Sequence, residues 1–76
     1  MTINAVTPTN SPEALGAAVL AARHKLGLTQ PQLALAAGVG VRFIVDLEAG
    51  KPTVRLATVL KVLNALGGTL AIEGLA

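Results

Sequence analysis

The chain has 76 residues, of which 53% are hydrophobic and 13% are charged, a composition too apolar for a disordered protein. No cysteine, one histidine and a single serine exclude a disulfide scaffold, a thiolate metal site and an imidazole cluster, and argue against a Ser-His-Asp triad. The net charge is only +2, but all six basic residues lie between positions 23 and 61, where two acidic residues oppose them. We therefore expect no enzyme, no metal and no cofactor, and a central basic segment that suits an anionic partner or is simply solvated.

The first predicted helix follows a polar, proline-containing stretch over 1–10, which we expect to be a flexible N-terminal arm. Ser11 suits the N-cap, since it precedes a proline and a glutamate that both favour a first helical turn. Gly27 is expected to end the helix. The apolar stripe of this helix contains Leu15, Val19, Ala22 and Leu26.

The apolar run over 14–22 lacks the basic region that precedes a signal-peptide core. No apolar run reaches the roughly 18 residues that a membrane span needs. A soluble, cytoplasmic protein without membrane contacts is expected.

Three more helices are predicted downstream, over 30–37, 41–49 and roughly 54–66. Thr29 is the expected N-cap of the first of these, and glycines 38, 40, 50, 67 and 68 separate the segments. The inward residues of the first two helices are Leu33, Ala37, Ile44 and Leu47. The predicted apolar face of the last helix contains Leu56, Val59, Leu60 and Leu63.

Residues 69–73 alternate in polarity and predict one short strand. A lone strand is unstable in water, so we expect it to pair with the same strand of a second subunit; the alternative is a frayed tail. This gives a flexible arm over 1–10, a helical domain over 11–67 and a dimerisation segment over 68–76. The expected dimer-interface residues are Leu66, Leu70 and Ile72. Together with Val59 and Leu63, they are expected to form part of the core or of this interface.

Two short helices joined at 38–40 have the proportions of a helix-turn-helix motif, whose second helix enters the major groove of DNA. The stretches LGLTQPQLALAAGVGVRFIVDLEAGK (26–51) and LATVLKVLNALG (56–67) resemble the phage-repressor or Cro-type (XRE) helix-turn-helix family. The RFI…LE.GKPT stretch and the terminal strand are similar to HipB-like antitoxins. This resemblance implies an all-α, phage-repressor-like bundle of about four helices, with a C-terminal strand in an intersubunit two-stranded sheet.

The resemblance also implies functional residues. Thr29 and Gln30 match the family's phosphate contact, and Lys51 matches a loop that touches the DNA backbone. The expected base-reading positions are Gly40, Val41, Arg42, Val45 and Asp46. This reading face is more apolar than is usual in the family, so valines could contact thymine methyls and an arginine could bind guanine.

Arg42 is the expected specificity residue, with a phosphate clamp without sequence information as the alternative. Asp46 suits phosphates poorly but could accept from cytosine N4. In the resembled family an arginine near the end of the first helix pairs with the glutamate of LE.G, which implies a partly buried ion pair of Arg23 and Glu48. Phe43 is expected to pack rather than stack on bases.

Two hypotheses of different class follow. The first is a homodimeric, sequence-specific repressor of double-stranded DNA at a palindromic operator; within it, the resemblance implies an antitoxin that represses its own operon and inhibits a HipA-like kinase toxin. A stand-alone repressor without a toxin is a variant of this hypothesis. The second is a protein-interaction module with little specific DNA binding.

Overall fold

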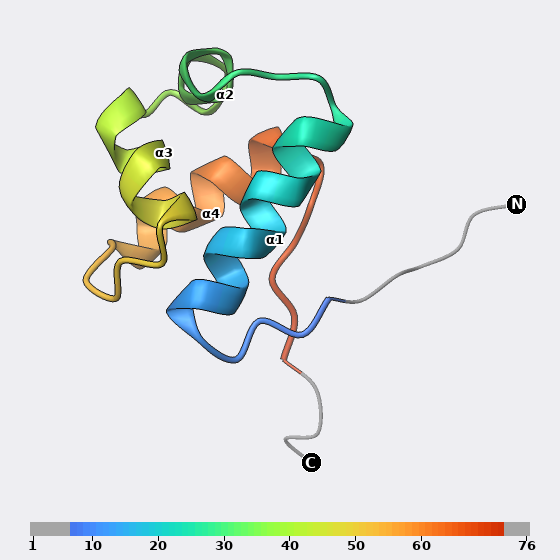
Figure 1. Cartoon of the computed structure of the whole chain (residues 1–76), viewed down its shortest axis with the longest axis vertical. Helices are drawn as coiled ribbons and strands as arrows, with labels where there is room; N and C mark the ends of the chain where they lie inside the picture. The colour runs from blue at the N-terminus through green and yellow to red at the C-terminus, as the bar shows by residue number, and fades with distance from the viewer. Residues whose placement is uncertain (1–6, 73–76) are drawn as a thin grey trace, which may run out of the picture.

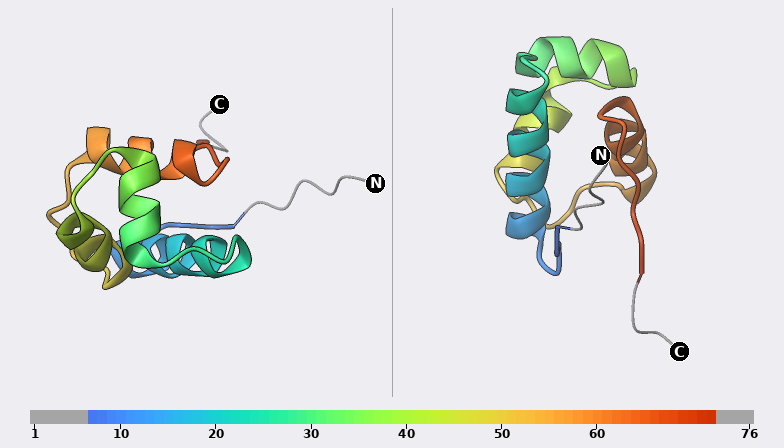
Figure 2. Two further views of the ribbon diagram at one scale, coloured as in Figure 1. Left: turned by 90° about the horizontal axis from the view of Figure 1, so that it is seen from above. Right: turned by 90° about the vertical axis from the view of Figure 1, so that its right-hand side faces the viewer.

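Four helices follow one another in the computed structural model, which describes residues 7–72. They are α1 (Pro12–Lys25), α2 (Gln30–Ala37), α3 (Val41–Glu48) and α4 (Leu56–Ala65). Figure 2 shows α1 and α4 on opposite sides of the molecule, with α2 running across one end between them. The all-α fold class is confirmed, and none of the helices of the described residues is long and apolar enough to cross a membrane.

Local capping fixes where α1 begins and ends. The Ser11 hydroxyl accepts a hydrogen bond from the backbone N–H of Ala14 at 3.0 Å, and Pro12 stands at the first position, as predicted. Gly27 follows the helix with a φ of +70°, a left-handed conformation that side chains disfavour. Leu26, expected to face inward, is 54% exposed because it lies beyond the last turn as the C-cap.

The core is aliphatic and draws on all four helices (Figure 1). Its buried residues are Val19, Leu33, Ala34, Ile44, Leu47, Val59 and Val62. The inward positions predicted for α2 and α3 are therefore confirmed, with Ala37 and Phe43 packed against the same cluster. Burial of such side chains is the main source of stability in a domain of this size.

The predicted apolar face of α4 is partly wrong. Val59 is buried and Leu63 packs against the core, but Leu56 and Leu60 are 61% and 44% exposed, and Val62 is buried in their place. Between positions 54 and 63 only Arg55 and Lys61 are charged, so the sequence pattern does not fix the rotation of this helix. The packing of α4 against α2 decides which stripe turns inward.

The C-terminal segment after α4 has no regular secondary structure over residues 69–72 (Figure 1). The strand expected over 69–73 is thus not found in this part, and Glu73 lies outside the described residues. Because that strand was expected to pair with a second subunit, its formation in a dimer stays a prediction.

Candidate nucleic-acid interface

The helix-turn-helix begins with a capping box at Thr29. Its hydroxyl accepts from the backbone N–H of Gln32 at 3.2 Å, and the Gln32 side-chain oxygen accepts from the backbone N–H of Thr29 at 2.8 Å. The N-cap was predicted from the sequence but its reciprocal glutamine was not, although the T-x-x-Q spacing signals it. Gly38 makes the turn into α3 with a φ of +72°, and Gly40 is the N-cap of α3 without a side-chain cap.

A buried ion pair ties α1 to α3. Nε of Arg23 lies 2.7 Å from Oε2 of Glu48, and the second guanidinium nitrogen Nη2 lies 3.0 Å from Oε1. The remaining Nη1 donates to the carbonyl oxygen of Leu28 at 2.8 Å. The two side chains are 9% and 5% exposed, so the structure brings these two residues together as the resemblance implied.

The charges of this pair stabilise each other. Burial alone would raise the pKa of Glu48, but hydrogen bonds from Arg23 and Gln30, together with the positive charges of Arg23 and His24, outweigh burial and lower this pKa below its ordinary value. The pKa of Arg23 is raised, first because its side chain donates hydrogen bonds to Glu48. Both groups therefore remain ionised at neutral pH.

Gln30 belongs to the same network. Its side-chain amide nitrogen donates to Oε1 of Glu48 at 3.0 Å, so this amide is turned toward the protein. A phosphate contact at Gln30 would therefore come from its backbone N–H, which stands at the unpaired start of α2. Thr29 is exposed beside it.

Gly16 lets α1 approach α3 closely. A Cβ atom added there would lie against the carbonyl oxygens of Leu47 and Glu48, 2.9 Å from the latter. This close approach was not predicted, although a glycine inside a helical pattern is a signal of close packing. The contact brings the last turn of α3 against α1, where Arg23 meets Glu48.

The opposite face of α3 is open to solvent. Ile44 and Leu47 are buried, whereas Val41 is 45% exposed and Val45 is 38% exposed. The Arg42 side chain is 85% exposed. The predicted base-reading positions therefore share the outer face of one helix, with Gly40 exposed at its start.

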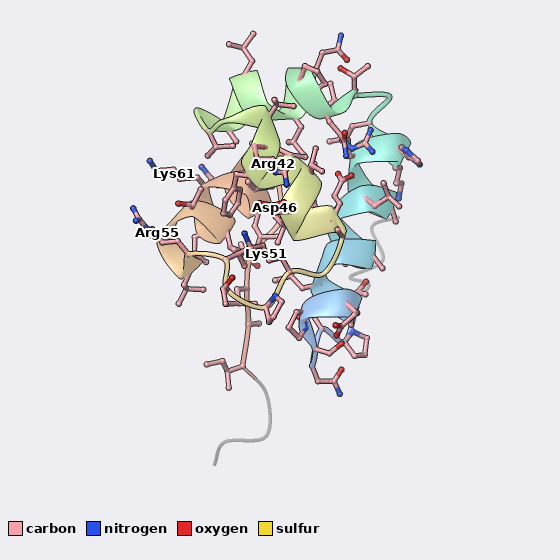
Figure 3. All side chains as sticks on the ribbon, turned by 60° about the vertical axis from the view of Figure 1, so that its left-hand side comes forward. Arg42, Asp46, Lys51, Arg55 and Lys61 are labelled. Atoms are coloured by element: carbon pink, nitrogen blue, oxygen red, sulfur yellow. The ribbon has the colours of Figure 1, made fainter. Side chains whose placement is uncertain are left out.

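One carboxylate on this face meets two cations (Figure 3). Oδ1 of Asp46 lies 3.2 Å from Nε of Arg42, and Oδ2 lies 3.5 Å from Nζ of Lys51 in the loop after α3. Arg55, the N-cap of α4, and Lys61 project outward from α4 in the same view. Both belong to the predicted central basic segment, but no role was predicted for either.

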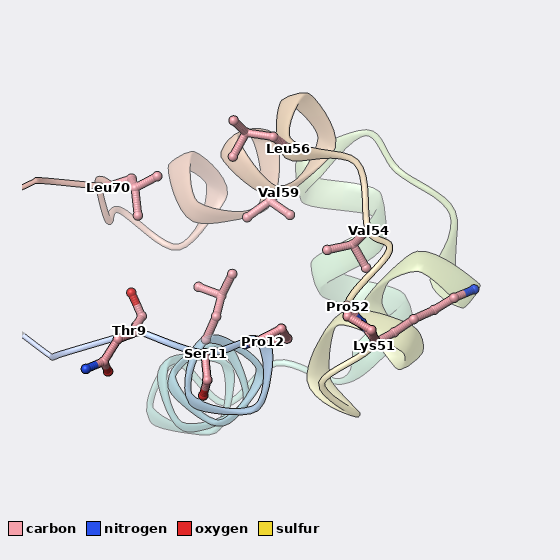
Figure 4. Close-up of a pocket in the computed structure, with 11 residues that line it drawn as sticks. Thr9, Ser11, Pro12, Lys51, Pro52, Val54, Leu56, Val59 and Leu70 are labelled. Atoms are coloured by element: carbon pink, nitrogen blue, oxygen red, sulfur yellow. The ribbon is translucent and has the colours of Figure 1, made fainter.

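A groove of about 400 Å³ opens between the start of α1, the loop after α3 and α4 (Figure 4). Leu70, in the C-terminal segment, lines this groove and is 47% exposed. Ile72, two residues further along the chain, is 74% exposed. Leu66 packs partly against the core, so of the three expected dimer residues it has the least free surface. Within the described residues, no group of His, Cys, Asp or Glu is arranged to hold a metal ion.

Known proteins share this architecture. The helix-turn-helix family HTH_3 matches residues 19–72. An uncharacterized HTH-type transcriptional regulator of Sinorhizobium fredii is 52% identical over 62 residues, which cover 82% of each chain.

Solved structures match over most of the chain. A HipB variant in its O2 20mer complex superposes with a TM-score of 0.84 at 25% identity, over 95% of this chain and 100% of that one. The complex of HipA, HipB and O2-O3 gives a TM-score of 0.83 at 25% identity, over 93% and 100%. A toxin–antitoxin module from Streptococcus pneumoniae gives 0.66 at 38% identity, over 79% and 71%.

Proposed function

Because the chain belongs to the helix-turn-helix family, we propose that it represses transcription as a homodimer bound to a palindromic operator. The observation that carries this proposal is the division of α3 into two faces. Its inner face is buried against the core, while its outer face presents an 85% exposed arginine and two half-exposed valines. A recognition helix needs this combination of rigid backing and accessible side chains.

We assign the DNA contacts by their places in the motif. Thr29 and Gln30 at the start of α2 would bind a phosphate, and Lys51 would bind the backbone beyond α3. The base-edge contacts would come from the outer face of α3, with valines against thymine methyls and an arginine on guanine. These positions are Gly40, Val41, Arg42, Val45 and Asp46.

Dimerisation would use the C-terminal segment. Residues 68–76 would pair across the dimer axis as a two-stranded sheet, residues 11–67 would bind DNA, and residues 1–10 would act as a flexible arm. Leu70 and Ile72 are exposed, and Leu70 shares one groove with the exposed Leu56. This supports the assignment, because apolar side chains that gather on one surface are typical of an interaction site. The two α3 helices would then enter major grooves about 34–36 Å apart.

The finer role that we propose is that of an antitoxin which represses its own operon in the cytoplasm and inhibits a HipA-like kinase. Its support is the likeness to HipB, solved together with HipA, and to a toxin–antitoxin module. Co-expression tests it: a HipA-like kinase encoded beside the gene of this chain should arrest growth when expressed alone and should copurify with this chain when both are present. Arrest that continues in its presence would leave a stand-alone repressor.

The DNA-binding proposal is tested by titration against DNA from upstream of its own gene, at two salt concentrations, with random DNA as competitor. Tight, salt-sensitive and competitor-resistant binding is expected, with a large loss in Arg42→Ala. Lys25→Ala, an equal loss of charge at the end of α1, is the matched control and should have little effect. A base-substitution scan then separates roles: if Arg42→Ala weakens all sequences alike, Arg42 is a phosphate clamp.

A protein-interaction module is the second candidate, favoured by the apolar groove and by the exposed Leu56 and Leu70 on its edge. Weak binding that random DNA competes away equally would support it against the repressor.

A further inference from the structure

We propose that Asp46 determines how strongly this surface discriminates its operator from random DNA. Its negative charge weakens the attraction of Arg42 and Lys51 for phosphates, and its carboxylate accepts a hydrogen bond from cytosine in a G·C base pair. The inference rests on the proposed DNA-binding function and deepens it. It starts from one carboxylate whose two oxygens face different cations, one on α3 and one on the loop that follows.

The carboxylate lies beneath its partners. The side chain of Asp46 is 21% exposed, compared with 85% for Arg42 and 52% for Lys51. An approaching phosphate therefore meets the two cations first and the carboxylate directly behind them. The local charge of the three groups is +1, where Arg42 and Lys51 alone would carry +2.

This reduction affects all DNA sequences alike. Phosphate contacts supply most of the non-specific affinity, and each neutralised phosphate contributes to the salt dependence. A fixed negative charge within about a Debye length opposes every such contact. Asp46 thus weakens the binding modes in which Arg42 and Lys51 contact only the DNA backbone. DNA sequences that offer no base contact to these residues are therefore bound less tightly.

A G·C base pair compensates that penalty. In the major groove guanine presents two acceptors for an arginine, and its cytosine presents an N4 amino group that donates to a carboxylate. Arg42 and Asp46 stand one helical turn apart with Nε and Oδ1 at 3.2 Å, a donor and an acceptor side by side. Exposed ion pairs are weak, so this one can open to let each partner bind its base.

The experiment compares Asp46→Asn with the wild-type chain on upstream DNA and on random DNA of equal length, across a salt series. Each subunit loses one opposing charge, so binding of the variant dimer to random DNA should depend more steeply on salt, by about 2 in the log–log slope. Affinity for random DNA should rise on the order of tenfold near physiological salt. Upstream DNA should gain less, so the specificity ratio falls.

Two further variants make the test specific. Asp46→Glu keeps the negative charge at this position and should keep the wild-type salt slope on random DNA. In a Lys51→Ala background, Asp46→Asn should change the salt slope less, because one of its two partners is gone. A base scan should lose its preference in Asp46→Asn at the same G·C pair as in Arg42→Ala.

The outcomes separate the two proposals. If Asp46→Asn raises the affinity for both DNAs by the same factor, Asp46 does not discriminate between them and the inference is wrong. If the wild type shows no preference for upstream DNA, the repressor proposal fails. In that case the salt dependence of binding to random DNA tests only the electrostatic part of the inference. A steeper slope in Asp46→Asn supports that part, and an unchanged slope overturns it.

Discussion

Helix α3 carries a carboxylate paired with an arginine on each of its two faces, and the two pairs differ in almost every physical respect. Glu48 on the inner face meets Arg23 through two short contacts, with side chains 5% and 9% exposed. Asp46 on the outer face meets Arg42 through one contact of 3.2 Å, with side chains 21% and 85% exposed. The first pair joins two helices that are distant in sequence, and the second stays within one helix.

Burial decides what each pair does. A buried charge cannot lose its partner without leaving an ion uncompensated in a low-dielectric interior, so the inner pair fixes the position of α3. In an exposed pair, water and salt ions can take the place of each partner at little cost. Arg42 and Asp46 can therefore separate and bind DNA instead. The same residue types thus serve as a structural tie on one face and as a candidate recognition unit on the other.

The largest expected effect breaks the inner pair. Glu48→Gln should lower the free energy of unfolding by about 3–5 kcal/mol, because it leaves the Arg23 charge buried without a counter-ion. Urea unfolding at neutral pH measures it, with Glu13→Gln, on the exposed start of α1, as a control that should cost little. A loss well under about 1 kcal/mol would show that the pair behaves like a surface pair, and the contrast between the two faces would disappear.

A smaller effect is expected from the contact that brings α1 against α3. Gly16→Ala places a methyl group against the carbonyl oxygens of Leu47 and Glu48, so the helices must move apart. Such overpacking costs about 1–3 kcal/mol, measured by the same unfolding experiment. Ala21→Ser, on the exposed side of α1, should change stability by less than about 0.5 kcal/mol. Equal effects at the two positions would contradict close packing at Gly16.

The inner pair should also make the stability of the fold depend on pH. The pKa of Glu48 is lower in the folded chain than its ordinary value of 4.5, so its contribution to stability is complete above that value. It is lost as the pH falls through the lower, folded pKa. Unfolding measured at pH 7 and pH 3 should therefore show a loss of stability in the wild type that is smaller in Glu48→Gln. Equal losses in both chains would exclude Glu48 as a source of the acid sensitivity.

Much of the fold could be predicted from local signals. Ser11 and Thr29 begin their helices as expected because a hydroxyl N-cap acts within three residues of itself, a range that a sequence pattern contains. Ile44 and Leu47 face inward as expected because they stand three residues apart on one side of α3, away from Arg42 and Asp46. Arg42 and Asp46 meet on that other side because they stand four residues apart.

The features that could not be predicted depend on other elements. Val62 is buried instead of Leu60 because α2 selects the inward stripe of a helix that is apolar nearly all round. The side chain of Gln30 turns toward Glu48, 18 residues away, which no spacing rule indicates. The strand expected at the C-terminus would need a second chain to pair with, so its formation would be a property of an assembly and not of one chain alone.

The smallest expected effect concerns the outer pair itself. A double-mutant cycle of Arg42→Ala and Asp46→Ala should give a coupling energy of about 0.3–0.5 kcal/mol in the free energy of unfolding, as for other exposed pairs spaced i,i+4. Here the arginine precedes the aspartate, the less favourable order along a helix, which keeps the coupling small. The coupling should shrink further when salt is raised, since both charges lie near solvent. A coupling above about 1 kcal/mol would mean that Asp46 holds Arg42 too firmly to release it to a base. The pair would then have to bind DNA without separating.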